Sequence, residues 1–379
     1  MNTVQAAFDP IVFLENAVQT VSNEDVAEMR ALLVETLETH GCDVTVDSAG
    51  NTIATKTSDS PDAGPHLVLN THIDTVSPHV PYGRDSDRIL GRGSCDAKGP
   101  LAALLAAFIG TEPAVGRLTL AVTPDEETLS LGAAALTGKI SHPNVEPIDG
   151  DLYIVGEPTN LDICTAAKGR FQGQLKLTGV NAHAAEPESG VNAISAVEDA
   201  LGVISAFDDG REPHPQLGRA TLTPTVIAGG DSTNQVPSHC TLTLDRRSIP
   251  PETEDEFSAA IEQAVRSAVD PTVGVEFTLT ERESPFLAAF STDPNHRLVE
   301  TLTTVATDET GGNGGTVRSF DAATEASYFS PKPTVVFGPG VLADETGAVA
   351  HSEREYVNTA DVKTAEKILL AAVRSLVTN

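Results

Sequence analysis

Five short segments of the sequence place histidine or carboxylate side chains where a metal ion could bind. The run PHLVLN, at 65–70, has the composition of a buried strand and leads directly to His72 and Asp74. Side chains two apart on a strand point to the same side, so Asp74 can accept a hydrogen bond from one ring nitrogen of His72 while the other nitrogen faces a metal. A surface histidine beside an aspartate is the alternative interpretation.

The loop GRGSCDAKG, at 91–99, leads into an apolar segment at 100–108 that we expect to be a buried helix. Its Asp96 could be a metal ligand, or it could cap the helix. Nucleotide binding is not supported here, because Asp96 stands where the pattern G-x-G-x-x-G needs its third glycine and no Gly-Lys-Ser or Gly-Lys-Thr follows.

Further carboxylates follow two predicted strands. Glu126 and Glu127 come after RLTLAVT, at 117–123, and Glu157 comes after DLYIV, at 151–155. Proteins of the α/β class collect functional groups at such strand ends. Adjacent carboxylates repel one another unless they are solvated or neutralised by cations, so an acidic surface turn and a metal site are both open interpretations of the first pair.

The fifth segment contributes His351, which follows the predicted strand TVVF at 334–337. A lone loop histidine is usually just exposed. Taken together, however, the segments gather two histidines and several carboxylates at the ends of strands. Mixed nitrogen and oxygen ligands that are rich in carboxylate suit zinc, manganese or cobalt, and one carboxylate can bridge two ions.

The elements that must position these residues alternate between strands and helices, which predicts an α/β sheet covered by helices on both faces. Apolar residues recur on one helical face at 22–40 and at 359–376. Between 171 and 281 the order changes to βαββαβ, the order of a ferredoxin-like unit. We therefore predict a catalytic domain made of residues 1–170 and 282–379, interrupted by an inserted domain at 171–281. Its expected elements are strands at 172–179, 218–228, 235–245 and 273–280, and helices at 191–206 and 253–268.

The composition is strongly acidic, with 54 Asp plus Glu against 24 Lys plus Arg and a net charge of -30. Such a chain repels nucleic acid and anionic membranes, so neither is an expected partner. No apolar run approaches the roughly 20 residues of a membrane span. The first residues lack a basic segment followed by an apolar stretch, and the 4 cysteines are scattered, so we expect a cytoplasmic protein with reduced thiols.

The segments THIDTV, GRGSCDAKG, TPDEET, VGEPT and AH occur in the order and spacing of a known metallopeptidase family. Over nearly the whole chain the sequence resembles the di-zinc family that includes acetylornithine deacetylase, succinyl-diaminopimelate desuccinylase, aminoacylase and carboxypeptidase G. The resemblance implies a zinc-exopeptidase-like catalytic domain with two zinc ions, for which cobalt or manganese could substitute. It implies five ligands in two sets: His72 and Glu157 on one ion, Glu127 and His351 on the other, and Asp96 bridging the two.

The same resemblance implies roles for residues around the metals. Glu126 corresponds to the general base, and Asp74 to the carboxylate that orients the first histidine. The inserted domain corresponds to a lid and dimerisation domain, whose His183 would stabilise the oxyanion in the neighbouring subunit's site. A surface histidine at a helix entrance is the alternative for this residue.

Two further residues of the inserted domain correspond to substrate-binding positions. Asn234 belongs to an Asn-x-x-Pro segment, and Arg247 to an Asp-x-Arg segment. Arg247 would grip the free carboxylate of the substrate. The adjacent Arg246 would point to the other face of the strand, where we expect a surface salt bridge.

The substrate class implied is a small N-acyl amino acid, of the N-acetylornithine or N-succinyl-diaminopimelate type, in arginine or lysine biosynthesis. The segment Thr324-Glu325-Ala326 resembles the acetylornithine deacetylase branch, whereas DAKGPLAA, at 96–103, is also similar to hydrolases that release lysine or ornithine from an amino-group carrier protein. A dipeptidase or carboxypeptidase is a further alternative. A non-enzymatic scaffold is disfavoured, because it would have no reason to retain Glu126 beside five ligand positions.

The acidic residues are spread along the whole chain and accompany only 4% aromatic residues, a pattern suited to high salt. We expect a halophilic protein whose thermal unfolding midpoint rises as KCl is increased, because salt screens the repulsion between carboxylates. Unfolding followed by circular dichroism over a KCl series checks this. A maximal midpoint in dilute buffer would contradict it.

Overall fold

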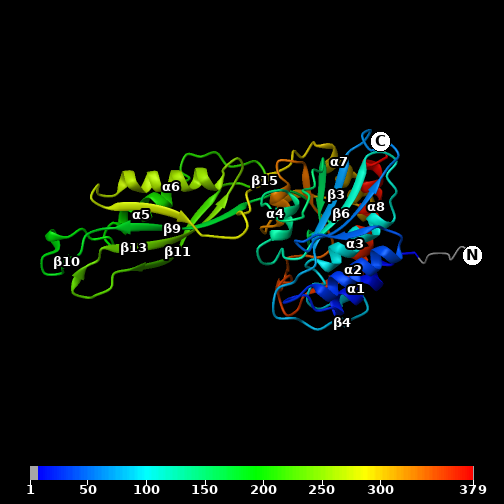
Figure 1. Ribbon diagram of the computed structural model, residues 1–379, viewed down its shortest axis with the longest axis horizontal. Coiled ribbons are helices and arrows are strands. Elements are labelled where there is room, and N and C mark those ends of the chain that lie inside the picture. The colour runs from blue at the N-terminus through cyan, green and yellow to red at the C-terminus, as the bar shows by residue number, and fades with distance from the viewer. Residues whose placement is uncertain (1–6, 379) are drawn as a thin grey trace, which may run out of the picture. The chain divides into compact units, whose positions relative to one another are not determined.

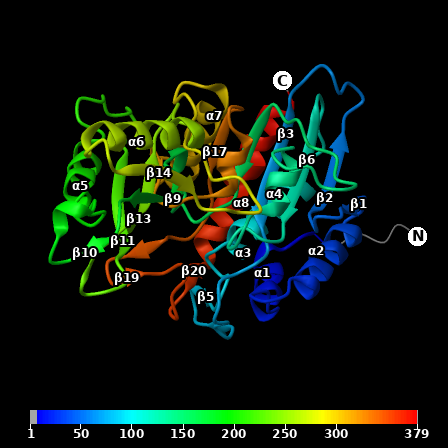
Figure 2. The same cartoon turned by 60° about the vertical axis from the view of Figure 1, so that its left-hand side comes forward.

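The computed structural model describes residues 7–378, and in this part of the chain a mixed sheet of nine strands forms the centre of the larger unit (Figures 1 and 2). Four of its strands, β6, β3, β7 and β17, run parallel to one another. The order across the sheet is β1 (Val44–Val46), β2 (Thr52–Thr57), β6 (Arg117–Thr123), β3 (His66–His72), β7 (Leu152–Val155), β17 (Thr334–Val336), β8 (Ile163–Ala167) and β15 (Phe290–Ser291), with β16 (Val317–Phe320) paired to β8.

The parallel strands are buried almost throughout, as expected for short apolar runs covered on both faces. In the register of β3 and β6, His72 lies opposite Thr123, so both strands end at the same level. Their carboxyl ends, and that of β7, therefore share one edge of the sheet. The α/β class predicted from the sequence is the class observed.

Helices pack against this sheet and against one another. The helix α3 (Lys98–Ile109) is buried along almost its whole length and contacts β3 and β6. Helices α1 (Pro10–Gln19) and α8 (Thr359–Leu376) pack on α3, and α7 (Arg297–Thr310) packs on α8. The remaining helices of this unit are α2 (Ala27–Thr39) and the short α4 (Leu131–Leu136).

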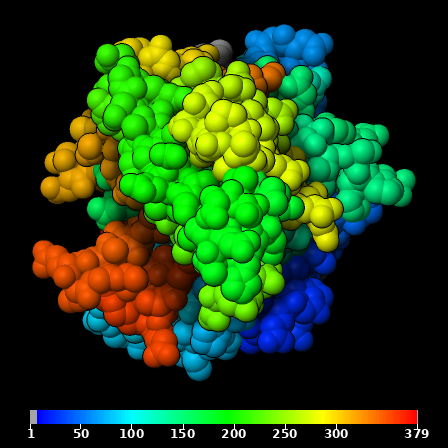
Figure 3. All heavy atoms as spheres, turned by 90° about the vertical axis from the view of Figure 1, so that its left-hand side faces the viewer, coloured from blue at the N-terminus to red at the C-terminus, as the bar shows by residue number. Residues whose placement is uncertain are grey.

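The second unit has its own core and a four-stranded antiparallel sheet. Its elements follow one another as β9 (Gly169–Thr178), α5 (Val197–Ala206), β11 (Thr221–Gly229), β13 (His239–Ser248), α6 (Glu254–Ala268) and β14 (Gly274–Leu279). The order across the sheet is β11-β13-β9-β14, which leaves β11 at an edge. Aromatic contacts of Phe257 with Phe171, Phe207 and Phe277 lie in its core. Figure 3 shows the surface of this unit as green and yellow atoms.

The division between the units lies close to the positions expected from the sequence. One unit comprises residues 1–166, 291–320 and 324–379, and the other comprises 167–290 and 321–323. The inserted unit is thus a few residues longer at each end than the predicted 171–281. The reason is that β9 begins at Gly169 and that Phe286 packs on Phe171.

Several elements differ from the sequence-based expectations. The helix predicted at 22–40 begins only at Ala27, and the one predicted at 191–206 begins at Val197. The single strand predicted at 235–245 is two strands, β12 (Gln235–Val236) and β13, because Pro237 lacks the amide hydrogen that a continuous ladder needs. Helices α1 and α7 were not predicted, although Asp9 caps α1 by accepting from the Ile11 amide at 2.9 Å and proline occupies the first position.

The smaller elements complete the description. A three-stranded sheet joins β4 (Gly83–Arg84), β5 (Arg88–Leu90) and β20 (Tyr356–Asn358), and two short ribbons pair β10 (Ala182–His183) with β12 and β18 (Ala343–Asp344) with β19 (Gly347–Ala348). The 3-10 helices are η1 (Pro187–Ser189) and η2 (Glu325–Phe329). Within residues 7–378, no helix has both the length and the apolar character needed to cross a bilayer.

Candidate metal centre

His72 is the last residue of β3 and is almost completely buried, with 1% of its surface exposed. Its Nδ1 lies 3.0 Å from the carbonyl oxygen of Asp74 and 3.2 Å from the Asp74 Oδ1. These contacts leave Nε2 facing the other way, 3.4 Å from Asp96 Oδ1. The strand ends before Asp74, so a turn rather than strand alternation brings the carboxylate to the ring.

The Asp74 carboxylate also anchors the segment that follows β6. Its Oδ1 accepts a hydrogen bond from the Glu126 amide and its Oδ2 accepts one from the Glu127 amide, both at 3.0 Å. Asp74 therefore sets the position of His72 and of both glutamates at once. The neighbouring Asp125 accepts from the amides of Leu131 and Gly132, at 2.6 and 2.9 Å, and so holds the start of α4.

Asp96 lies between the two histidines. Its Oδ2 is 3.1 Å from Nε2 of His351, and the same ring nitrogen is 3.0 Å from Glu127 Oε1. Asp96 does not cap α3, since the N-cap residue is Ala97 and no side-chain hydrogen bond caps this helix end. The helix-cap interpretation of Asp96 is therefore wrong.

The five residues expected as ligands come together in two groups that share one member. Donor atoms within 4.8 Å of one another define the group His72, Asp96 and Glu157 and the group Asp96, Glu127 and His351. The first group is fully buried, whereas the His351 side chain is about half exposed, at 51%. The two groups have the composition that the resemblance implies for two ions with Asp96 between them.

Burial and mutual repulsion shape the pKa values of the acidic members. Burial and the nearby Glu157 carboxylate raise the pKa of Glu126 well above its ordinary value, and burial together with Asp96 does the same for Glu157. Burial also acts to raise the pKa of Asp96, but hydrogen bonds from His351 and His72 outweigh it and lower the pKa. The cluster thus has more carboxylate than its own histidines neutralise.

The histidines respond in the opposite sense. Burial acts to lower the pKa of His72, yet hydrogen bonds to Asp74 and Asp96 raise it well above its ordinary value. Hydrogen bonds to Asp96 and Glu127 raise the pKa of His351 to about 10. The converging carboxylates therefore favour positive charge at both rings, and a divalent cation would supply the same compensation.

One orphaned atom shows that the residues fit a metal. His72 Nε2 is buried and, apart from the long 3.4 Å approach of Asp96 Oδ1, has no partner among the described residues, although its Nδ1 is fully engaged. A buried ring nitrogen aimed at carboxylates, with the opposite nitrogen held by an aspartate, is the arrangement of a metal-binding histidine. The donors are nitrogen and oxygen atoms, a set suited to zinc, cobalt or manganese.

Several residues around the cluster were not assigned a site role from the sequence. Thr324 donates its hydroxyl to Glu157 Oε1 at 3.0 Å, and the buried Glu325 accepts from the Thr123 hydroxyl at 2.8 Å. The segment Thr324-Glu325-Ala326 therefore lies directly behind the ligands. Glu355, four residues after His351, is also buried near Asp96. Its only sequence signal is this spacing from the histidine.

The other three predicted site residues lie in the second unit. His183 is exposed on β10, where its Nδ1 accepts from the Ala185 amide at 3.2 Å. Asn234 precedes β12, and its side-chain oxygen accepts from the Ser232 hydroxyl at 2.6 Å. Arg247 is partly exposed on β13 and donates from Nε to Asp245 at 2.8 Å.

Arg246 corrects one expectation. It forms salt bridges, with Asp208 at 2.6 Å and with Glu252 at 2.7 Å, but only 1% of it is exposed. It is therefore a core residue and not the surface residue expected from the sequence. The alternation of β13 still separates it from Arg247, because buried and half-buried residues alternate along this strand.

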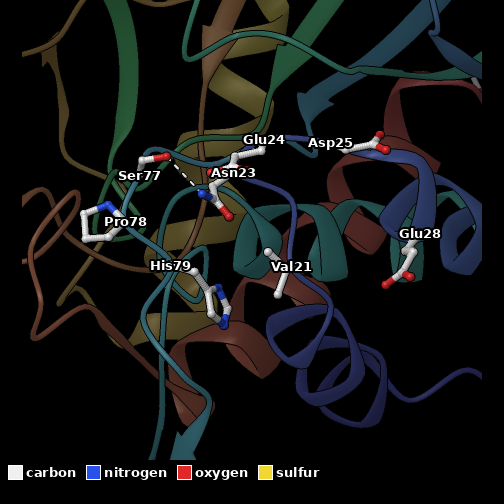
Figure 4. Close-up of a pocket in the computed structure, with 8 residues that line it drawn as sticks. All are labelled: Val21, Asn23, Glu24, Asp25, Glu28, Ser77, Pro78 and His79. Carbon is white, nitrogen blue, oxygen red and sulfur yellow. Dashed lines mark hydrogen bonds between the residues drawn. The ribbon is translucent and has the colours of Figure 1, made fainter.

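A cavity of about 630 Å³ elsewhere in the first unit contains none of the predicted ligands. It lies where α2 begins, beside the segment Ser77–His79. The side-chain amide of Asn23 donates to the Ser77 hydroxyl at 2.9 Å (Figure 4). Its carboxylates, Glu24, Asp25 and Glu28, show no convergence on a shared centre. Within residues 7–378, donor atoms that could hold a metal ion converge only at the histidine and carboxylate cluster.

Comparison with known proteins identifies the family. The sequence model described as "Peptidase family M20/M25/M40" matches residues 68–375, most of the chain. The chain belongs to this family. It is accordingly a hydrolase that acts on amide bonds, as the sequence predicted, and the M20 family membership agrees with a metal-dependent site.

Individual proteins resemble the chain over most of its length. A protein of Pyrobaculum aerophilum named as a LysW-lysine/LysW-ornithine hydrolase is 31% identical over 357 residues, which cover 92% of each chain. The structure of aminopeptidase PepT from Bacillus cereus superposes with a TM-score of 0.75 at 19% identity, covering 98% of this chain and 100% of that one. The YXEP protein of Bacillus subtilis, titled a dinuclear metal binding peptidase from the M20 family, has a TM-score of 0.70 at 13% identity, covering 98% of both chains.

The shared position of Asp96 leads to a prediction about metal content. Replacement of Asp96 by Ala should remove bound metal from both groups, whereas Glu127→Gln should weaken only the group that contains His351. Metal bound per chain after dialysis, measured by plasma mass spectrometry, checks this. The exposed Asp62→Asn serves as the control, and an Asp96→Ala protein that keeps the wild-type content would rule out bridging.

Proposed function

We propose that the chain is a two-metal hydrolase that releases the amino group of lysine or ornithine from an acyl group. The observation that carries the proposal is the meeting of His72, Glu157, Glu127 and His351 around the shared Asp96. These are the residues that would hold two ions, zinc being the proposed metal and cobalt or manganese the substitutes. The Bacillus subtilis relative is described as a dinuclear metal binding peptidase, which supports two ions rather than one.

The chemistry divides between the metals and the protein. Bound metal ions lower the pKa of water from about 15.7 to about 7 and polarise the amide carbonyl. Glu126 lies next to the ligand Glu127 and has its backbone held by Asp74. Its carboxylate would accept the proton of the attacking water and deliver it to the nitrogen of the leaving amine. Its raised pKa suits a group that must take up and release a proton.

The curated relative favours an acyl group that is part of a carrier protein. Its name gives LysW-linked lysine and LysW-linked ornithine as its substrates. The match covers 92% of this chain and 92% of the relative. We therefore propose that the substrate is lysine or ornithine joined through an amide to an amino-group carrier protein. This reaction class serves lysine or arginine biosynthesis.

A free N-acyl amino acid is the second candidate. The segment Thr324-Glu325-Ala326 favours N-acetylornithine over N-succinyl-diaminopimelate, and it lies behind Glu157. For either small substrate, Arg247 would bind the free carboxylate and Asn234 would contribute a further polar contact. Among the described residues, Arg247 donates only from Nε, to Asp245. Its two terminal nitrogens could therefore make a bidentate contact with the substrate carboxylate.

A substrate panel separates the candidates. Purified protein loaded with zinc should release lysine or ornithine from the carrier conjugate with a kcat/KM at least about tenfold above that for N-acetylornithine, N-succinyl-diaminopimelate or a dipeptide. Chromatographic detection of the free amino acid measures this. Faster turnover of N-acetylornithine would favour the second candidate, the free N-acyl amino acid. If the protein hydrolyses none of these substrates, the proposed function is rejected.

The proton-transfer role of Glu126 predicts a separation of turnover from metal binding. Glu126→Gln should lower kcat by about 10²–10⁴-fold, the usual contribution of a general base, while bound metal stays near two per chain. Glu127→Gln is the matched comparison, because it alters a ligand one residue away. Loss of metal from Glu126→Gln would move this residue into the ligand shell.

We further propose that the chain forms a homodimer through the inserted unit. Its edge strand β11 exposes Val226 and Ile227, at 59% and 58%, and an exposed apolar edge strand is a template for pairing with another chain. His183 would then reach the partner's site and donate to the oxyanion.

The dimer proposal has its own test. Replacing Ile227 by Lys should convert a dimer to a monomer in light scattering, because a charge on the edge opposes pairing. His183→Ala should stay dimeric with full metal content but lose about 10²–10³-fold in kcat, the cost of one oxyanion donor. A His183→Ala protein with the wild-type rate would reject the oxyanion role, and a wild-type monomer would reject the dimer.

A further inference from the structure

A buried ion pair lies beside the candidate metal centre, and its hydrogen bonds among the described residues go to backbone groups and not to the side chain of a candidate ligand. Arg92 Nη1 donates to Glu355 Oε2 at 2.6 Å, and the two side chains are only 2% and 0% exposed. Burying two charges costs several kcal/mol per ion, which their attraction often fails to repay. Stability alone therefore gives a weak reason for this pair, and its other hydrogen bonds indicate a second role.

The second oxygen of Glu355 holds the loop that carries Asp96. Its Oε1 accepts from the Cys95 amide at 3.1 Å and from the Asp96 amide at 3.2 Å. Glu355 thereby fixes the backbone on which the shared carboxylate is mounted. Asp96 is followed by Ala97, the N-cap residue of α3. The loop is therefore held by Glu355 and by the helix that follows it.

Arg92 extends the same anchor to two other segments. Its Nη1 also donates to the carbonyl of Ser352, next to His351, and its Nε donates to the carbonyl of Pro78, both at 3.2 Å. Pro78 lies four residues beyond Asp74, on the segment that follows His72. The Arg92 and Glu355 side chains therefore connect the segments that carry His72, Asp96 and His351.

His351 has a particular need for such an anchor. Its φ of 62° lies in the left-handed region that residues with a side chain seldom adopt, so the surrounding structure must hold it there. The contact from Arg92 to Ser352 acts on the residue that follows it. Glu355 lies on the same segment, directly before β20.

We propose that Arg92 and Glu355 are positioning residues that set the affinity of the site for its metal ions. The inference rests on the proposed metal centre. The pair acts through backbone groups: Glu355 holds the amides of Cys95 and Asp96, and Arg92 holds the segment that keeps His351 within reach of Asp96 and Glu127. Outer contacts of this kind usually change metal affinity by about 10–100-fold when they are lost.

Two variants separate positioning from plain stabilisation. Arg92→Met combined with Glu355→Leu removes both charges together, a replacement that often keeps or raises stability, but it leaves the Cys95 and Asp96 amides without their acceptor. Glu355→Gln keeps an acceptor oxygen for these amides but places an NH2 donor where Oε2 accepts from Arg92, so it breaks the link from Glu355 to Arg92. The matched control is Glu252→Gln, which removes one partner of the equally buried Arg246 in the other unit.

The measurement is zinc affinity of the full-length protein, by competition with a chromophoric chelator, alongside thermal unfolding of the metal-free form. We expect the double variant to bind zinc about 10–100-fold more weakly than wild type, with Glu355→Gln near the lower end of this range. Glu252→Gln should lower the unfolding midpoint but keep the wild-type affinity.

The outcomes distinguish the inference from the function on which it rests. If wild-type protein binds no zinc, the metal centre itself fails. If wild type binds two ions and either folded variant binds them with wild-type affinity, the pair is only structural and the inference is overturned. Should the double variant not fold, Glu355→Gln decides alone, because it retains the hydrogen-bonding oxygen.

Discussion

The excess of buried carboxylate over positive charge is the constraint around which this site is built. Asp96, Glu157 and Glu127 each bring an oxygen within 4.8 Å of a ring nitrogen of His72 or His351, at the end of a sheet whose parallel strands are buried. Such groups cannot all be ionised in a poorly solvated place without a cation. The raised pKa values of His72 and His351 show how strongly the cluster attracts positive charge.

Backbone amides hold this unfavourable arrangement in place. Asp74 accepts from the amides of Glu126 and Glu127, Asp125 from the amides at the start of α4, and Glu355 from the amides of Cys95 and Asp96. None of these three carboxylates is a candidate ligand. Each orients a segment that carries a candidate ligand or directly follows one. The site is therefore positioned through the main chain as much as through the ligands themselves.

The two arginines of β13 show how one strand serves two purposes. Arg246 points into the core of the inserted unit, where two carboxylates and the rings of Phe207 and Phe257 surround it. Arg247 points to the opposite face and keeps most of its guanidinium free. Alternation along the strand thus separates a buried, structural arginine from one that stays partly exposed.

The sequence by itself determined the candidate ligands, the α/β class and the strand, helix and strand order of the inserted segment, because spacing and hydrophobic period are local properties. It located β6 and α8 to the residue, since their apolar patterns end at clear boundaries. It missed α1 and α7, and it read the strand around Pro237 as continuous.

Only the tertiary structure decided which groups face one another. The Arg92 and Glu355 pair joins residues 263 positions apart, and Thr324 meets Glu157 across 167 positions, so no local pattern marks either contact. The same holds for the burial of Arg246, whose neighbours Asp208 and Glu252 come from separate segments. The order and spacing of the motifs mark the candidate ligands through the family resemblance, whereas the charges and amides that hold these residues depend on the packing of distant segments.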